Sequence, residues 1–194
     1  MPSRRFSHAI AEGDGISVVA AVEDADAARA AEAQRAEALV VHGDPARLRD
    51  ATRLPILWRA NAAVDRAAAV ADAVTLTLPD EDEDHDPAQL RHEEALASGL
   101  DCAVEVRNEE ELERALDVLD PEIFLLVPPQ DGDEEKLESV LELLAAVPAG
   151  KLAIADLTVT TEHEVHELER AGMDAVIVRA ADVSPLVGET PPEV

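Results

Sequence analysis

Eight short runs of apolar, often β-branched residues recur along the 194-residue chain and limit the folds that it can adopt. Continuous runs of this kind are typical of strands that are buried on both faces of a parallel sheet. The spacing between runs leaves room for one helix after each strand. The runs occupy residues 16–22, 38–42, 55–59, 73–78, 100–106, 123–127, 152–156 and 175–179.

The segments between the runs have the period and the end signals of helices. Leu112, Ala115, Leu116 and Leu119 share one face of a helical turn pattern, as do Leu137, Val140, Leu141 and Leu144. Asn108 with Glu111, and Thr161 with Glu164, have the spacing of a capped N-terminus. Gly99, Gly150 and Gly172 stand where a helix commonly ends in a left-handed residue.

Eight strand–helix units predict an α/β fold, a minimal (β/α)8 TIM barrel with eight parallel strands. The alternative is an open doubly wound sheet, but no G-x-G-x-x-G motif follows the first strand. Such barrels typically have about 250 residues and rarely fewer than about 200, so short helices and loops are expected. We expect a single barrel over residues 16–184, an N-terminal extension over 1–15 and a frayed C-terminal tail over 185–194.

The chain carries 43 Asp and Glu against 16 Lys and Arg, for a net charge of −27, and only two of the cations are lysines. The acids are dispersed among apolar segments, a pattern typical of proteins adapted to molar salt, where screening reduces self-repulsion. Such a field repels nucleic acid and anionic membranes, so neither is expected as a partner. The acidic stretch 79–86 follows the fourth strand; it indicates a solvated loop or, alternatively, a weak cation site.

The single cysteine, Cys102, lies in an apolar run and is expected to be a buried small hydrophobe. No run of 18 apolar residues and no signal-peptide pattern occurs, so we expect a cytoplasmic protein. Nothing in the sequence calls for a metal or a cofactor. His163 and His166 have metal-like spacing, but they fall on an outer helix and are expected to face solvent.

Residues 101–116, DCAVEVRNEEELERAL, resemble a segment of indole-3-glycerol phosphate synthases that reads VEVH-(D/N)-EEELERAL. Residues 164–178 resemble that family's E-x-x-x-L-x-x-A-G-(A/V)-D-A-x-L-V ending, and 55–59 resemble its third strand, P-(V/I)-L-x-K. The resemblance extends over about residues 16–183 and implies a ribulose-phosphate-binding type of barrel from the tryptophan pathway.

By this resemblance, Glu105 stands at the position of a catalytic glutamate on the fifth strand. Arg59 replaces the third-strand lysine that serves as general acid, and Asp156 replaces a glutamate on the seventh strand. Arginine keeps its proton at working pH, so it can stabilise an anion but can hardly act as an acid. The glycines expected beside a phosphate after strands seven and eight are replaced at 157–158 and 179–181.

Alternation along the strands, aligned on Glu105, directs further charged side chains into the same end of the barrel. We predict ligand-binding roles for Glu23, His42, Arg107 and Arg179, beside the catalytic candidates Glu105, Arg59 and Asp156. Two interpretations stay open. The charges can form an interior salt-bridge plug, or they can line a pocket for a small anionic metabolite.

Three functional hypotheses follow. The first is a divergent barrel of the synthase type that lacks the standard activity and binds a small anionic metabolite or performs altered chemistry. The second is an active tryptophan-pathway lyase or isomerase with a rebuilt site. The third is a non-catalytic interaction protein.

Overall fold

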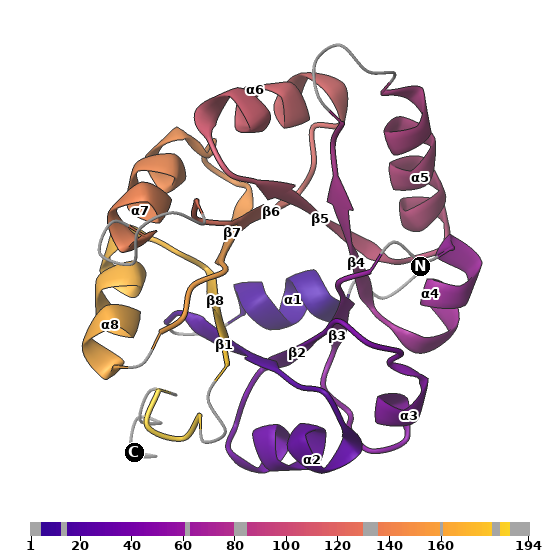
Figure 1. The fold of residues 1–194 in the computed structure, drawn as a ribbon, viewed down its shortest axis with the longest axis vertical. Helices are drawn as coiled ribbons and strands as arrows, with labels where there is room; N and C mark the ends of the chain where they lie inside the picture. The colour runs from indigo at the N-terminus through magenta and orange to yellow at the C-terminus, as the bar shows by residue number, and fades with distance from the viewer. Residues whose placement is uncertain are drawn as a thin grey trace.

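The computed structural model describes residues 5–12, 15–60, 63–79, 85–129, 136–159, 161–179 and 183–186, and it contains a closed barrel of eight parallel strands (Figure 1). The strands follow one another around the barrel in sequence order, and β8 closes it by pairing with β1. The eight predicted strands and the (β/α)8 fold are therefore confirmed. The strands are β1 (Ser17–Ala21), β2 (Ala38–Val41), β3 (Ile56–Trp58), β4 (Ala73–Thr77), β5 (Asp101–Val106), β6 (Ile123–Leu126), β7 (Leu152–Ala155) and β8 (Ala175–Val178).

Short helices form the outer ring, as the chain length predicts. The third helix has only four residues and the fourth only seven. The helices are α2 (Ala25–Ala33), α3 (Ala46–Arg49), α4 (Val64–Val70), α5 (Asp86–Ala97), α6 (Glu109–Val118), α7 (Lys136–Ala146) and α8 (Glu162–Ala171), with α1 (Arg5–Ala11) before the first strand.

The predicted helix caps at the two best-marked N-termini are present. The Asn108 side chain accepts a hydrogen bond from the backbone N–H of Glu111, and Thr161 forms a reciprocal capping box with Glu164. Gly172 ends α8 in the left-handed conformation, with φ 91°, which a side chain would disfavour. Local sequence thus fixes where these helices begin and end.

Alternation along each strand divides the core into two layers. One layer lies between strands and outer helices and contains Trp58, Cys102 and Leu112. The other fills the barrel and contains Leu57, Ala103 and Ile154. Neighbouring residues in one strand thus face opposite layers, which fixes the inward direction of Arg59 and Glu105 at the strand ends.

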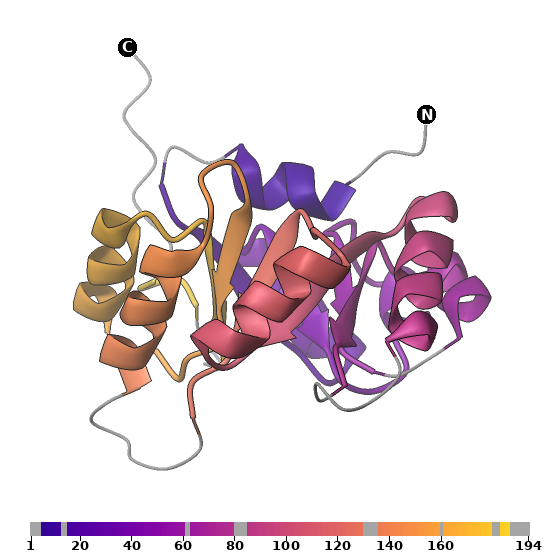
Figure 2. The same cartoon turned by 90° about the horizontal axis from the view of Figure 1, so that it is seen from above.

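Helix α1 covers the N-terminal end of the barrel (Figure 2). Phe6 and Ile10 are almost completely buried and belong to the same apolar cluster as the inward-facing strand residues. The backbone N–H of Ser7 donates to the buried Asp101 carboxylate at 2.8 Å, which satisfies an otherwise orphaned donor at the start of α1. The sequence predicted no secondary structure for this segment, so the helix that closes the N-terminal end of the barrel is a finding of the structure.

Two expectations fall largely outside the described residues: the acidic loop, of which 80–84 are not described, and the C-terminal tail from 187. Within the described part of the tail, Leu186 is buried against the strand–helix layer. None of the described helices has the length and apolar character needed to cross a membrane.

Candidate functional site

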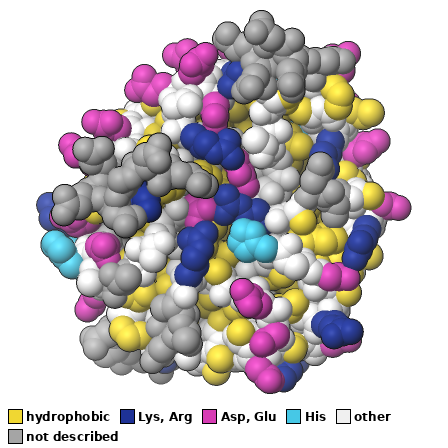
Figure 3. Space-filling model, viewed as in Figure 1, with side chains coloured by type: hydrophobic (Ala, Val, Ile, Leu, Met, Phe, Trp, Pro, Cys, Tyr) yellow, Lys and Arg dark blue, Asp and Glu magenta, His cyan; other side chains and the backbone are white. Residues whose placement is uncertain are grey.

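The C-terminal mouth of the barrel gathers basic, acidic and histidine side chains near its centre (Figure 3). Arg59, directly after β3, donates from Nε to Oε1 of Glu105 on β5 at 2.8 Å. A second guanidinium nitrogen of Arg59 pairs with Oδ2 of Asp156, which follows β7. One arginine therefore joins three strand ends that lie up to 97 residues apart in sequence.

Two further arginines extend these pairs in both directions. Arg107 lies 3.4 Å from Oε2 of Glu105 and 3.6 Å from Oε2 of Glu111 at the start of α6. Arg179, directly after β8, pairs with the remaining oxygen of Asp156. The result is a chain of six alternating charges, which we call the ion-pair chain: Glu111, Arg107, Glu105, Arg59, Asp156 and Arg179.

Burial differs along the ion-pair chain. The side chains of Glu105, Asp156 and Arg59 are 9%, 6% and 15% exposed, whereas those of Arg107 and Arg179 are 43% and 37% exposed. Burial acts against the charged guanidinium, but the hydrogen bonds and charges of Glu105 and Asp156 outweigh it, so the pKa of Arg59 is raised. The Arg59 guanidinium therefore stays charged, and the two carboxylates satisfy it.

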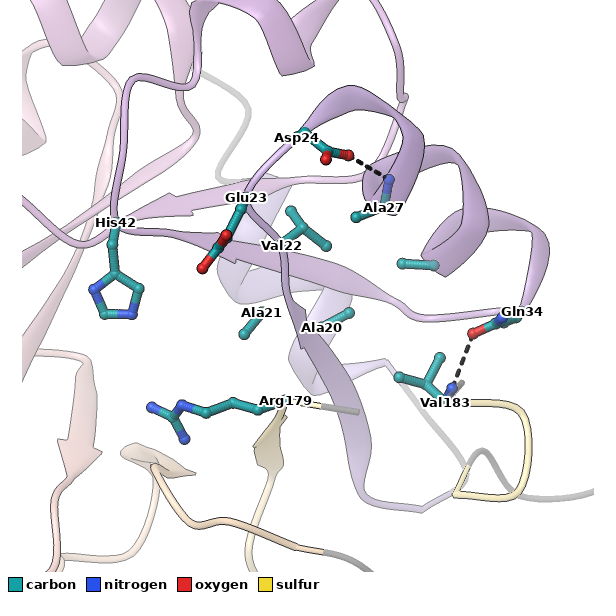
Figure 4. Close-up of a pocket in the computed structure, with 11 residues that line it drawn as sticks. Ala20, Ala21, Val22, Glu23, Asp24, Ala27, Gln34, His42, Arg179 and Val183 are labelled. Atoms are coloured by element: carbon teal, nitrogen blue, oxygen red, sulfur yellow. Dashed lines mark hydrogen bonds between the residues drawn. The ribbon is translucent and has the colours of Figure 1, made fainter. Parts of the chain in front are cut away.

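A cavity of about 410 Å³ opens beside one end of the ion-pair chain (Figure 4). We call it the first cavity. The Glu23 carboxylate, the His42 imidazole and the Arg179 guanidinium are directed toward this space from the ends of β1, β2 and β8. Its inner wall is apolar and includes Ala20, Ala21 and Val22.

A second cavity, of about 740 Å³, lies beside the other part of the mouth. Arg59 and Glu105 contribute to its lining, together with Thr75 and Thr77 of β4 and Arg91 of α5. His42 lines this cavity as well as the first one. The ion-pair chain thus runs through the mouth, and His42 contributes to the lining of both cavities.

All seven predicted site residues lie at this mouth. Five of them, Glu105, Arg59, Asp156, Arg107 and Arg179, are members of the ion-pair chain. The other two, Glu23 and His42, are exposed and line the first cavity without a hydrogen bond to another described residue. The mouth combines a salt-bridged centre with open space at its side, so features of both the plug and the pocket interpretations are present.

Thr75, Thr77 and Arg91 were not among the predicted site residues. The alternation of β4, read from Ala73, places both threonines inward and could have indicated them. Arg91 carries no such signal because its approach to the mouth depends on how α5 packs, with one guanidinium nitrogen 3.5 Å from the carbonyl oxygen of Ala60.

His163, His166 and Cys102 have the structural roles expected of them. His163 and His166 are 82% and 65% exposed on α8 and lie near glutamates of the same helix. Trp58 is buried on the helix-facing side, where the Arg66 guanidinium lies 5.4 Å from its ring centre. Burial raises the pKa of the Cys102 thiol to about 12, as suits an inert core residue. Among the described residues, no group of three or more His, Cys, Asp or Glu side chains could hold a metal ion.

Comparison with known proteins shows sequence similarity over half of the chain. Indole-3-glycerol phosphate synthase of Polaromonas naphthalenivorans (strain CJ2) is 38% identical over 98 residues, which are 50% of this chain and 37% of that enzyme. The same enzyme of Geobacillus sp. (strain WCH70) is 32% identical over 91 residues, 45% of this chain and 34% of that enzyme. The matched region therefore spans just over a third of these relatives. No family model matches the chain.

The fold is also found among solved structures. Mutant tryptophan synthase α-subunits of Pyrococcus furiosus superpose with TM-scores of 0.68 and 0.67 at 14% and 16% identity, over 85% of this chain and 87% of theirs. Identity at this level supports the barrel fold alone. The chain is thus a (β/α)8 barrel that is similar, over half of its length, to indole-3-glycerol phosphate synthases.

Proposed function

We propose that the protein is a divergent barrel of the indole-3-glycerol phosphate synthase type that binds a small anionic metabolite at its mouth and does not catalyse the standard ring closure. The observation that carries this proposal is the state of Arg59. The resemblance assigns a proton-donating lysine to this position, but here a guanidinium is held between Glu105 and Asp156. A guanidinium in this setting stays charged, so it supplies no acid for ring closure.

Arg179 is the best-placed anchor for an anion. It ends the ion-pair chain, is 37% exposed, and directs its guanidinium toward the first cavity, while Arg59 is engaged by two carboxylates (Figure 4). A guanidinium offers paired N–H groups that suit a phosphate or carboxylate. The net charge of −27 repels anions from most of the protein surface. A cation that is directed into a cavity attracts them locally.

Anion binding can be tested with sulfate and inorganic phosphate as probes, by calorimetric titration at constant KCl concentration. The native chain should bind both, and Arg179→Gln should weaken binding about tenfold, which corresponds to about 1.4 kcal/mol. Arg170→Gln on the exposed face of α8 removes the same charge away from the mouth and is the matched control. Equal losses in both variants, or no binding by the native chain, would refute the anion site.

A second candidate is an active tryptophan-pathway lyase with a rebuilt site. It is favoured by the retention of Glu105 at the position that the resemblance assigns to a catalytic glutamate. Expression in a bacterial strain that lacks the synthase, grown without tryptophan, separates the two candidates. Growth that requires Glu105 would establish the lyase, and failure by a well-expressed, folded chain supports the divergent barrel.

A further inference from the structure

We propose that His42 is the proton-carrying group of the mouth, which takes up a proton from solvent when a dianionic group such as a phosphate monoester binds against Arg179. This inference rests on the proposed anion binding and adds the charge class of the ligand and the residue that responds to it. It also moves the proton-transfer role away from Glu105 and Asp156, the acids that the resemblance favours.

The two buried carboxylates are poorly placed to exchange protons. Both oxygens of Glu105 lie near arginine nitrogens, and both oxygens of Asp156 are paired with arginines. Protonating Asp156 would leave Arg179 without its carboxylate partner, and protonating Glu105 would leave Arg59 with one carboxylate instead of two, which weakens the charge pairing at the mouth. The arginines themselves keep their protons.

His42 differs from these groups in three respects. It is exposed, it lies outside the ion-pair chain, and it lines both cavities. Imidazole is the side chain whose charge ordinarily changes near neutral pH, and it can donate to an anion when protonated. Of the residues that line the two cavities, His42 is the one histidine.

The charged groups that line the two cavities with His42 determine which ligand charge would stabilise the protonated imidazole. Glu23, two residues after β1, and Arg179, directly after β8, face the first cavity (Figure 4). Asp24 also lines this cavity, and its side chain caps the start of α2. Arg59, Arg91 and Glu105 face the second cavity. Asp44, two residues further along the chain, is paired with Arg66 on α4.

A dianion needs more positive charge than Arg179 supplies, because that guanidinium is already shared with Asp156. Protonation of His42 adds one positive charge to the lining of the cavity that Arg179 faces, and Glu23 lines the same cavity. The step balances as follows: for each anion bound, up to one proton leaves solvent and binds to an imidazole nitrogen, and no covalent bond to the ligand changes.

Sulfate is the appropriate probe, because it stays dianionic from pH 6 to pH 8, whereas a phosphate monoester titrates near pH 6. At constant KCl concentration, sulfate should bind the native chain more tightly at pH 6 than at pH 8, by at most tenfold per pH unit for one linked proton. At pH 7, the binding enthalpy should depend on the ionisation enthalpy of the buffer and give an uptake of between zero and one proton.

His42→Gln should bring the ratio of affinities at pH 6 and pH 8 close to one and abolish the buffer dependence. His163→Gln, which alters a histidine on the outer surface, should retain both effects. Glu23→Gln should bind sulfate more tightly than the native chain at pH 8, because it removes a negative charge from the cavity.

The outcomes separate the two proposals. Sulfate binding by the native chain with no pH dependence, or with a dependence that persists in His42→Gln, overturns the role of His42 and leaves the anion site intact. Binding by Glu23→Gln at pH 8 that equals binding by the native chain would place the anion outside the first cavity and also overturn the inference. No sulfate binding at either pH would remove the anion site and this inference together.

Discussion

Arg59 Nε donates a hydrogen bond to Glu105 Oε1 at 2.8 Å, and this contact links the end of β3 to β5 at the mouth of the barrel. The same guanidinium pairs with Asp156 after β7. A position that would carry a proton donor in a synthase-like site therefore serves here as the central link of an ion-pair chain. This structural role supports our proposal that the position supplies no acid.

Removing Arg59 should be strongly destabilising. Arg59→Met leaves Glu105 and Asp156 close together and largely buried without their shared cation, so the free energy of unfolding should fall by about 3–5 kcal/mol. Denaturant unfolding measures the loss. Arg107→Gln, at a half-exposed link of the chain, should cost less than about 1 kcal/mol.

The triple variant Arg59→Met, Glu105→Gln, Asp156→Asn tests the origin of that loss. It also removes the charges of the two buried carboxylates that have lost their shared cation, so it should recover most of the stability that Arg59→Met loses. If Arg59→Met is as mild as Arg107→Gln, the centre of the ion-pair chain does not stabilise the fold.

Helix α1, which covers the N-terminal end of the barrel, should contribute to the stability of the whole fold. Phe6 is fully buried at the N-terminal end of the barrel, so Phe6→Ala should lower the free energy of unfolding by about 3–5 kcal/mol. Leu90→Ala, at a side chain that is 58% exposed, is the control and should change stability by less than about 0.5 kcal/mol. Comparable effects of the two substitutions would show that α1 is not packed in solution as it is here.

Buried His92 should make stability depend on pH. Desolvation lowers the pKa of His92 from its ordinary value of 6.5, so near this value the unfolded chain binds more protons than the folded one. The stabilising contribution is therefore complete above about pH 6.5 and is lost as the pH falls below it. The difference in unfolding free energy between the native chain and His92→Gln should shrink from pH 7.5 to pH 5.5.

His163→Gln controls for the general effect of pH on an acidic protein, because His163 is 82% exposed. Its difference from the native chain should stay constant over the same range. A constant difference for His92→Gln as well would show that His92 takes up protons equally in the folded and unfolded chains.

The acidic surface should make the fold salt-dependent, in line with our proposal that the protein is adapted to salt. Raising KCl from about 0.1 M to about 1 M shortens the screening length from about 10 Å to about 3 Å and should raise the thermal unfolding midpoint. The triple variant Glu94→Gln, Glu113→Gln, Glu142→Gln removes exposed acids from α5, α6 and α7 and should reduce this salt dependence. An unchanged slope would contradict self-repulsion as its cause.

The sequence alone determined the architecture and seven of the mouth residues, but not Thr75, Thr77 and Arg91. The apolar runs located all eight strands, since parallel strands buried on both faces need continuous apolar residues. Alternation then aligned Arg59, Glu105 and Asp156 toward one interior, as observed. Asn108 and Thr161 marked helix starts because capping depends on residues only three positions apart.

Only the tertiary structure decided how the two ends of the barrel are assembled. The pairing of Arg59 with two carboxylates depends on side-chain reach across the barrel, which alternation along a strand does not specify. His42 lines both cavities because of the space that is left between strands, helices and the ion-pair chain. The position of α1 depends on Phe6, Ile10 and Asp101, which closure of the barrel brings together. Local pattern fixes periodicity and direction, whereas charge pairing and cavities are set by contacts between distant segments.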